Sequence, residues 1–200
     1  MLEDKITSMK VTVLSCSLNP QSKSRILADA CKTWIQAKGW EISLLDIRDY
    51  PLPDFDNDTI FQSAHYSTIK NAIQNADSII IASPVYNWSL SSTLKKVIEA
   101  TGSHSPETGI TSAWFDKIVT FVCVGGLHHS YMAYSPVAAS LMMDFKCIIN
   151  PHIVYAVGGD FDVNSTITPD IVKRMDKVMC VMVELTERLA NRNCLSTWEV

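Results

Sequence analysis

IIIASPVYNW, residues 79–88, is the stretch that decides the fold class of this chain. The isoleucine run at its start is typical of a strand buried on both faces, as in a parallel sheet. Because proline lacks the N–H group that a sheet ladder needs, we expect the strand to end at Pro84, with a short loop and then a helix from Ser89 or Leu90. Ligands of open α/β sheets bind just outside the carboxyl ends of the strands, so this aromatic loop is a candidate site for a flat ring.

Apolar and amphipathic segments alternate along the rest of the chain. The pattern predicts strands over Val11–Leu14, Glu41–Asp46, Ile118–Val124 and 148–157, and helices over Lys23–Lys38, Asp58–Gln74, Pro136–Phe145 and Pro169–Asn191. Pro151 should lie at a bulge or edge of the last strand. Five strands with intervening helices predict an α/β fold of three layers: a doubly wound, five-stranded parallel sheet covered on both faces. The chain has no repeat or linker, so we expect one domain over residues 1–200.

The composition is that of a globular chain. Apolar residues make up 47% and charged residues 19%, which argues against a disordered chain. With a net charge of -4 and no basic stripe, we expect no nucleic-acid partner. We expect no membrane association either, since no stretch is apolar enough to span a bilayer and Met1–Met9 does not resemble a signal peptide. The six cysteines show no paired spacing, which indicates reduced core residues of a cytoplasmic protein.

Hydroxyl side chains crowd the loop between the first strand and the first helix, SCSLNPQSKSR at residues 15–25. Hydroxyls and unpaired backbone N–H groups at a helix N-terminus form an anion site, and Lys23 and Arg25 add positive charge beside it. A phosphate monoester would suit such a site. The alternative is that Ser22 or Ser24 only caps the helix. The loop lacks the GxxxxGK[ST] and GxGxxG patterns, which disfavours a nucleoside triphosphate site and a dinucleotide fold.

A pair of glycines, Gly125 and Gly126, ends the strand over Ile118–Val124. Glycine pairs let a ligand approach the backbone closely, although they also occur in tight turns. His128 and His129 follow, but the other histidines are scattered, so the spacing predicts no metal site. The loops after the first, third and fourth strands should leave the sheet at the same edge. Together they predict one crevice with an anion end and a ring-stacking end.

These loops resemble those of the NADPH-dependent FMN reductase family, over about residues 10–155. The first loop is similar to the family's phosphate loop, Gly-Ser-x-Arg-x-x-Ser. Ser17 and Ser22 match its serines, and Ser24 falls where a further hydroxyl or an amide side chain is common. Two residues depart from the pattern, because Cys16 replaces the glycine and Asn19 replaces the arginine. Asn19 can donate only a neutral hydrogen bond, so a fixed positive charge is lost from the site.

The same resemblance implies the remaining contacts to a flavin. The isoalloxazine ring is assigned to the loop after the isoleucine run, at Pro84, Val85, Tyr86 and Asn87. Its pyrimidine end is assigned to Gly125 and Gly126. The resemblance further implies the flavodoxin-like strand order, FMN as cofactor, NADPH or NADH as donor, and ping-pong hydride transfer to a small-molecule acceptor such as a flavin or quinone. The flavin carries the chemistry of such a reaction, so we assign no catalytic residue and no metal.

Two other functions stay open. A non-catalytic FMN-binding electron carrier would use a similar site, although the Thr/Ser-x-Thr-Gly-x-Thr loop of short-chain flavodoxins is absent. A hydrolase would need an activated nucleophile, but the chain has no GxSxG motif, and neither Ser17 nor Ser83 has an assigned base. Trp88, Trp114 and Phe115 lie in predicted loops, where exposed aromatic residues often mark an interface. With the dimers common in the family, they predict a homodimer or homotetramer.

Overall fold

The computed structural model describes residues 9–104 and 109–198. The expected single domain of residues 1–200 extends beyond these ranges. The segment Met1–Met9, for which we expected no signal peptide, also lies outside them except for Met9. In chain order the elements are β1 (Lys10–Ser15), α1 (Lys23–Ala37), β2 (Glu41–Asp46), the 3-10 helix η1 (Thr59–Gln62), α2 (Tyr66–Gln74), β3 (Ser78–Tyr86), β4 (Ser89–Leu90), α3 (Ser92–Gly102), β5 (Ile118–Gly125), the 3-10 helix η2 (His128–Tyr134), α4 (Ser135–Phe145), β6 (Ile148–Ile149), β7 (Val154–Val157), the 3-10 helix η3 (Gly158–Asp160) and α5 (Pro169–Leu189).

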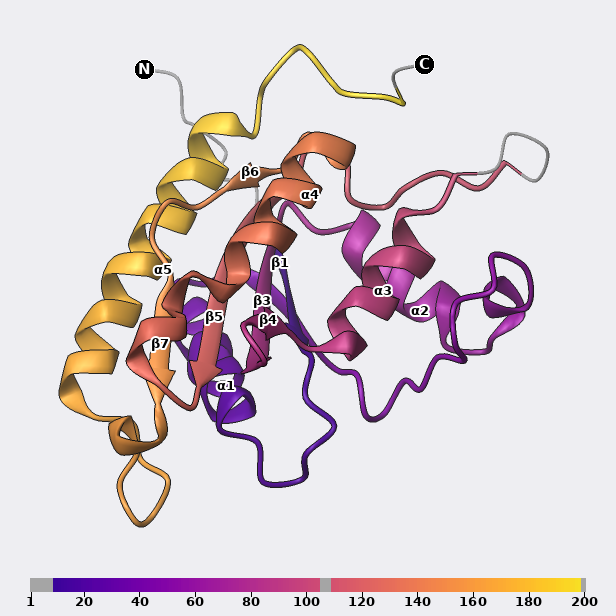
Figure 1. Ribbon diagram of the computed structural model, residues 1–200. Helices are drawn as coiled ribbons and strands as arrows, with labels where there is room; N and C mark the ends of the chain where they lie inside the picture. The colour runs from indigo at the N-terminus through magenta and orange to yellow at the C-terminus, as the bar shows by residue number, and fades with distance from the viewer. Residues whose placement is uncertain (1–8, 105–108, 199–200) are drawn as a thin grey trace, which may run out of the picture.

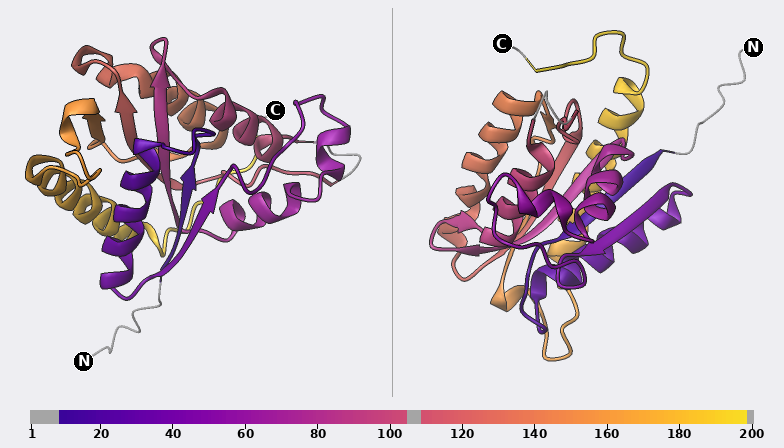
Figure 2. Two further views of the ribbon diagram at one scale, coloured as in Figure 1. Left: turned by 90° about the horizontal axis from the view of Figure 1, so that it is seen from below. Right: turned by 90° about the vertical axis from the view of Figure 1, so that its right-hand side faces the viewer.

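A parallel sheet forms the middle layer of the fold. Its order is β2-β1-β3-β5, and β6 and β7 both pair with β5 beyond it. Helices α1 and α5 cover one face, and α2, α3 and α4 cover the other (Figure 1 and Figure 2). The short antiparallel β4 pairs with β3 and lies off this path. With β4 left out and β6 and β7 counted as one fifth strand, this is the flavodoxin-like order. The predicted α/β fold, a doubly wound parallel sheet between two layers of helices, is confirmed.

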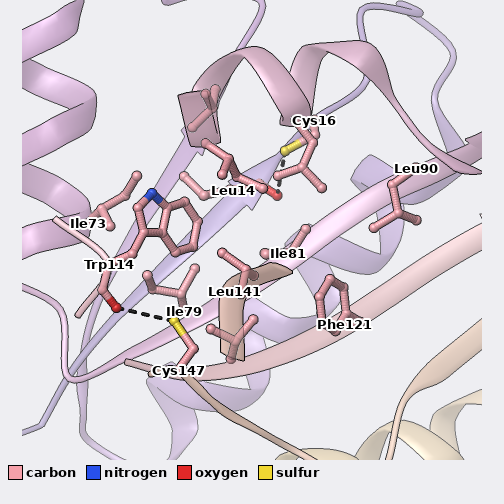
Figure 3. Close-up of a cluster of buried hydrophobic side chains, with 14 of the residues drawn as sticks. Leu14, Cys16, Ile73, Ile79, Ile81, Leu90, Trp114, Phe121, Leu141 and Cys147 are labelled. Carbon is pink, nitrogen blue, oxygen red and sulfur yellow. Dashed lines mark hydrogen bonds between the residues drawn. The ribbon is translucent and has the colours of Figure 1, made fainter. Parts of the chain in front are cut away.

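The central strand β3 is buried on both faces, as the isoleucine run predicts. Ile79 and Ile81 belong to the apolar cluster that packs against α2, α3 and α4, whereas Ile80 and Ala82 belong to the cluster under α1 and α5. Successive side chains of a strand point to opposite faces, so a run with no polar member can fill both cores at once. Figure 3 shows the first cluster, with Ile79 and Ile81 among its labelled residues.

Trp114 lies in this same cluster rather than on the surface. Its side chain is 0% exposed among the apolar residues of the cluster (Figure 3). Its indole N–H donates to the Thr101 hydroxyl at 2.7 Å. The expectation that Trp114 marks an interface is therefore wrong, because the loop that carries it folds inward and its polar atom finds a partner there. Phe115 is half-buried, and Trp88 is exposed as expected.

The strand β3 continues past Pro84, where we expected it to end. The Ala82 carbonyl accepts the N–H of Cys16 at 2.8 Å on the side of β3 that faces β1. Alternate residues of a strand point the same way, so the nitrogen of Pro84 also faces that side. The ladder with β1 has already ended at Ser15, which pairs with Ala82, so no partner there requires an N–H from proline. The chain then forms β4 before α3, which begins at Ser92 rather than at residue 89 or 90.

Two more predicted elements are interrupted. The last strand is split into β6 and β7, with Pro151 in the gap at the sheet edge. Asn150 fills this gap, because its side chain donates to the Val178 carbonyl and accepts the N–H of His152. The helix expected over Asp58–Gln74 forms only as η1 and α2. Ser63 separates the two, because its backbone is extended (φ -61°, ψ 136°) and ends η1 before α2 begins at Tyr66.

The cysteines divide into two groups. Cys16, Cys31, Cys123 and Cys147 are buried and free, which confirms the expectation of core thiols for these four. Cys180 on α5 and Cys194 beyond its end are free but exposed, so the expectation of burial is wrong for both. Within the described ranges, no helix combines the length and the apolarity that crossing a membrane requires.

Candidate ligand-binding cleft at the carboxyl ends of the strands

The loop after β1 and the carboxyl ends of β3 and β5, with Gly126 just beyond β5, meet in one cleft of about 280 Å³ at the lower edge of the sheet in Figure 1. The cleft is lined by Ser17, Asn19, Gln21, Ser22, Lys23, Ser24, Pro84, Val85, Tyr86, Val124, Gly125 and Gly126. Every residue that we predicted for the site lines this cleft except Asn87. An adjoining hollow of about 430 Å³ shares Val85, Tyr86 and Gly126 with the cleft, and Asn87 lines that hollow.

One end of the cleft consists of hydroxyl groups at the N-terminus of α1. The Ser22 hydroxyl accepts the N–H of Arg25 at 3.4 Å as the helix cap, and it lies 2.8 Å from the hydroxyl of Ser24. The Ser17 hydroxyl accepts the N–H of Asn19 at 3.3 Å. The positive end of the dipole of α1 therefore faces a wall of hydroxyls. An anion with several acceptor oxygens suits this end of the cleft.

The two basic residues of this loop have different partners. Arg25 forms an ion pair with Asp46, a buried carboxylate that Arg48 also contacts at 2.9 Å. Arg25 is absent from the lining of the cleft, because its guanidinium is paired with this buried carboxylate at the end of β2. Lys23 lines the cleft, and its ammonium donates to the Gly158 carbonyl at 3.0 Å. Lys23 therefore places a positive charge at the anion end of the cleft.

The two glycines of the third loop have different surroundings. A Cβ added at Gly125 would overlap the hydroxyl of Tyr155, which donates to the Leu127 carbonyl at 2.6 Å. A Cβ added at Gly126 would meet no atom within 4 Å. Gly125 is therefore needed for packing against β7. Gly126 leaves open space on the wall of the cleft, where a flat group can approach the backbone.

The other end of the cleft is aromatic and open. Tyr86, at the end of β3, is 56% exposed, and Trp88 is 59% exposed. The Trp88 ring lies 5.3 Å from the ring of His129 in η2, with 31° between their planes. Leu127 and Ser130 complete the adjoining hollow. This end offers flat apolar surfaces with few charges, which suits a planar ring.

Several lining residues escaped the sequence reasoning. Gln21, Val124, Leu127 and Ser130 line the cleft or its hollow, and the local pattern of Gln21, Leu127 and Ser130 does not distinguish them from ordinary loop residues. Only Val124 carried a usable signal, since it is the last residue of the predicted strand and must therefore lie at the edge of the sheet where ligands bind.

A second hollow, of about 370 Å³, lies at the opposite end of the sheet. Its charged groups already have partners within the protein. Arg192 pairs with Asp116 at 3.5 Å, and the Lys117 ammonium donates to the carbonyls of Gln74 and Ala76. We assign this hollow to the packing of the C-terminal segment. Among the described residues, no group of three or more His, Cys, Asp or Glu side chains is arranged to hold a metal ion.

Comparison with known proteins gives consistent relatives. The family model of NADPH-dependent FMN reductases matches residues 9–162. An FMN reductase (NADPH) of Pseudomonas putida is 29% identical over 118 residues, which cover 59% of this chain and 55% of that protein. An NAD(P)H:quinone oxidoreductase of Solanum tuberosum is 33% identical over 125 residues, which cover 59% of each chain. The match thus spans little more than half the length of these two relatives.

A solved structure shares the fold. The flavoenzyme NAD(P)H:(acceptor) oxidoreductase of Paracoccus denitrificans superposes with a TM-score of 0.71 at 18% identity, covering 90% of this chain and 98% of that one. At this identity the likeness concerns the arrangement of the sheet and its helices.

Proposed function

This chain belongs to the NADPH-dependent FMN reductase family, and we propose that it is an oxidoreductase that holds FMN in the cleft and passes electrons from NADPH or NADH to a small-molecule acceptor. One observation carries the proposal: the loops after β1, β3 and β5 bring a hydroxyl-lined anion end and an open aromatic end into a single cleft. A phosphorylated planar molecule matches both ends at once.

The residues present fit FMN. Ser17, Ser22 and Ser24, with the N-terminus of α1, would hold the phosphate, and Lys23 would balance part of its charge. The open space beside Gly126 admits the edge of a flat ring to the backbone. Pro84, Val85, Tyr86 and Asn87 would line the other side of that ring. When bound, FMN supplies the hydride and electron transfer that no side chain of the protein can perform.

The protein's own residues bind and orient the reactants. The net reaction takes a hydride, with its two electrons, from the nicotinamide and one proton from water, and it converts a quinone to a hydroquinone. It requires no protein nucleophile, which agrees with the mainly neutral lining of the cleft. The hollow beside Tyr86 is open to solvent, and we assign the nicotinamide and the acceptor to it in turn.

The assembly and location are part of the same proposal. Exposed apolar side chains occur at the cleft and on the element beside it: Tyr86 and Leu127 line the hollow, and Tyr131 and Met132 lie in η2. Such a patch favours contact with a second copy, so we propose a homodimer or homotetramer, which light scattering after size-exclusion chromatography would measure. Free cysteines and a reduced nicotinamide donor favour the cytoplasm as the place of action.

A visible spectrum of the purified protein tests the proposal most directly. We expect a yellow protein that releases FMN, identified by liquid chromatography, and that oxidises NADPH or NADH when a quinone or free flavin is added. A protein that gains no visible absorbance on titration with FMN would overturn the proposal. A yellow protein that oxidises neither nucleotide with any acceptor would instead be an electron carrier.

A further inference from the structure

The turn between β3 and β4 places a tryptophan where the backbone favours glycine. Val85 pairs with Leu90 and Tyr86 pairs with Ser89, so Asn87 and Trp88 are the two turn residues of a tight hairpin. Their φ angles are 49° and 62°, both in the left-handed region. This is the pattern of a type I′ turn, in which asparagine and glycine are common. A bulky side chain such as tryptophan is strained in that conformation.

Burial does not offset this strain. Trp88 is 59% exposed and belongs to none of the apolar core clusters. Its ring contact is with His129, at 5.3 Å between centroids, on the neighbouring loop of the cleft. A residue held in a strained backbone conformation without the compensation of burial points to a functional role, such as contact with a ligand.

Trp88 also occupies a particular place. It lines the hollow that continues from the cleft, together with Tyr86 and Leu127. Its partner His129 comes from η2, which follows the Gly125-Gly126 wall. The indole therefore joins the second and third loops at the mouth of the cleft. A planar ligand in the hollow therefore meets the rings of both Tyr86 and Trp88.

We propose, building on the proposed function, that Trp88 supported by His129 is a stacking surface for flat, electron-poor rings and thereby sets the enzyme's preference among electron acceptors. The face of an indole ring is electron-rich, and it stacks on planar rings such as those of quinones or nicotinamides. An acceptor without a ring gains nothing from this surface. The exposed indole lines the hollow, where a planar ligand can stack on its face.

The variant Trp88→Gly tests this, because glycine suits the left-handed turn and the variant should fold at least as stably as the wild type. Trp88→Phe keeps a ring and is the matched control. Steady-state kinetics compare two acceptors, 2-methyl-1,4-naphthoquinone and ferricyanide, which has no ring. We expect Trp88→Gly to raise KM for the naphthoquinone about tenfold, with little change for ferricyanide, and Trp88→Phe to lie close to the wild type.

The kinetic pattern also shows which reactant stacks on Trp88, the acceptor or the nicotinamide. If the acceptor stacks on Trp88, only KM for the naphthoquinone rises. If the nicotinamide stacks there, KM for NADPH rises with both acceptors, which supports the stacking surface but overturns its role in acceptor preference. Calorimetric titration of the oxidised FMN-loaded protein with the naphthoquinone, without NADPH, measures binding apart from turnover.

Two results would overturn the stacking surface. Equal dissociation constants for the naphthoquinone in the wild type and Trp88→Gly would do so. So would a Trp88→Gly protein that melts at lower temperature and loses its oligomeric state, since Trp88 would then serve packing between subunits. Failure of the proposed function gives a different result: the wild type would bind no FMN or would oxidise NADPH with neither acceptor. Titration of the purified protein with the naphthoquinone, with or without FMN, would still compare the wild type with Trp88→Gly.

Discussion

The Ser91 hydroxyl donates a hydrogen bond to the Cys16 carbonyl at 2.8 Å and so ties the start of α3 to the loop after β1. The same hydroxyl accepts the N–H of Leu94 at 3.3 Å as the cap of α3. The Ser91 backbone N–H donates to the Ser83 hydroxyl, near the end of β3, at 3.2 Å. One buried serine therefore joins two of the three loops that form the cleft.

Ser91→Ala should weaken both the fold and the cleft. Loss of the cap and of the bond to Cys16 should lower the free energy of unfolding by about 1–2 kcal/mol, measured by urea denaturation. FMN should bind more weakly, because the first loop is no longer held. Ser92→Ala is the control, since Ser92 is exposed and should change neither quantity. Equal effects of the two substitutions would contradict the positioning role of Ser91.

The neighbouring glycines should respond oppositely to alanine. Gly126→Ala should unfold like the wild type but bind FMN less tightly, because its methyl group would project into the open wall of the cleft. Gly125→Ala should lose about 1–3 kcal/mol of stability, because its methyl group would overlap Tyr155. Thermal melts and FMN titrations of both variants measure the two effects. Normal FMN affinity in Gly126→Ala would contradict the placement of the ring at this wall.

Substitution of the two basic residues in the first turn of α1 should have different effects. Lys23→Met should weaken binding of FMN but leave riboflavin binding unchanged, because only FMN carries the phosphate that its ammonium would balance. Arg25→Met should instead lower stability by about 1–3 kcal/mol, since it leaves the buried Asp46 with Arg48 as its cationic partner. Fluorescence titration with both flavins distinguishes the two residues. If Lys23→Met weakens both flavins equally, the phosphate does not lie beside it.

Burial of the core thiols predicts a loss of stability at alkaline pH. Burial raises the pKa of Cys31 and Cys123 from 9.0 to about 12. The unfolded chain releases these protons near pH 9 while the folded chain retains them, so their contribution is complete below pH 9 and is lost as the pH rises toward 12. Cys31→Ala should make the decline between pH 9 and 11 shallower, by up to about 1.4 kcal/mol per pH unit. Cys180→Ala, at an exposed position, should leave the slope unchanged in urea denaturation under reducing conditions.

Much of the fold was predictable because its determinants are local. The isoleucine run of β3 predicts a strand buried on both faces. The apolar residues of α5 recur at helical spacing and predict one buried face: Ile171, Met175, Val178, Met179 and Met182. The hydroxyls between β1 and the first turn of α1, and the glycines at the end of β5, were also placed correctly, because each group follows from the end of a predicted strand. Pro84 misled the prediction because its effect depends on where β1 stops, which is a fact about another segment.

The amino-acid sequence by itself determined the alternation of strands and helices and the three loops that carry polar, aromatic and glycine residues. Those features follow from the periodicity of burial within each segment. Only the tertiary structure decided that Asp46 holds Arg25, that Trp114 turns inward and that Trp88 meets His129. Each of these depends on which distant residue comes within a few ångströms, and that is set by how the layers pack rather than by any local pattern.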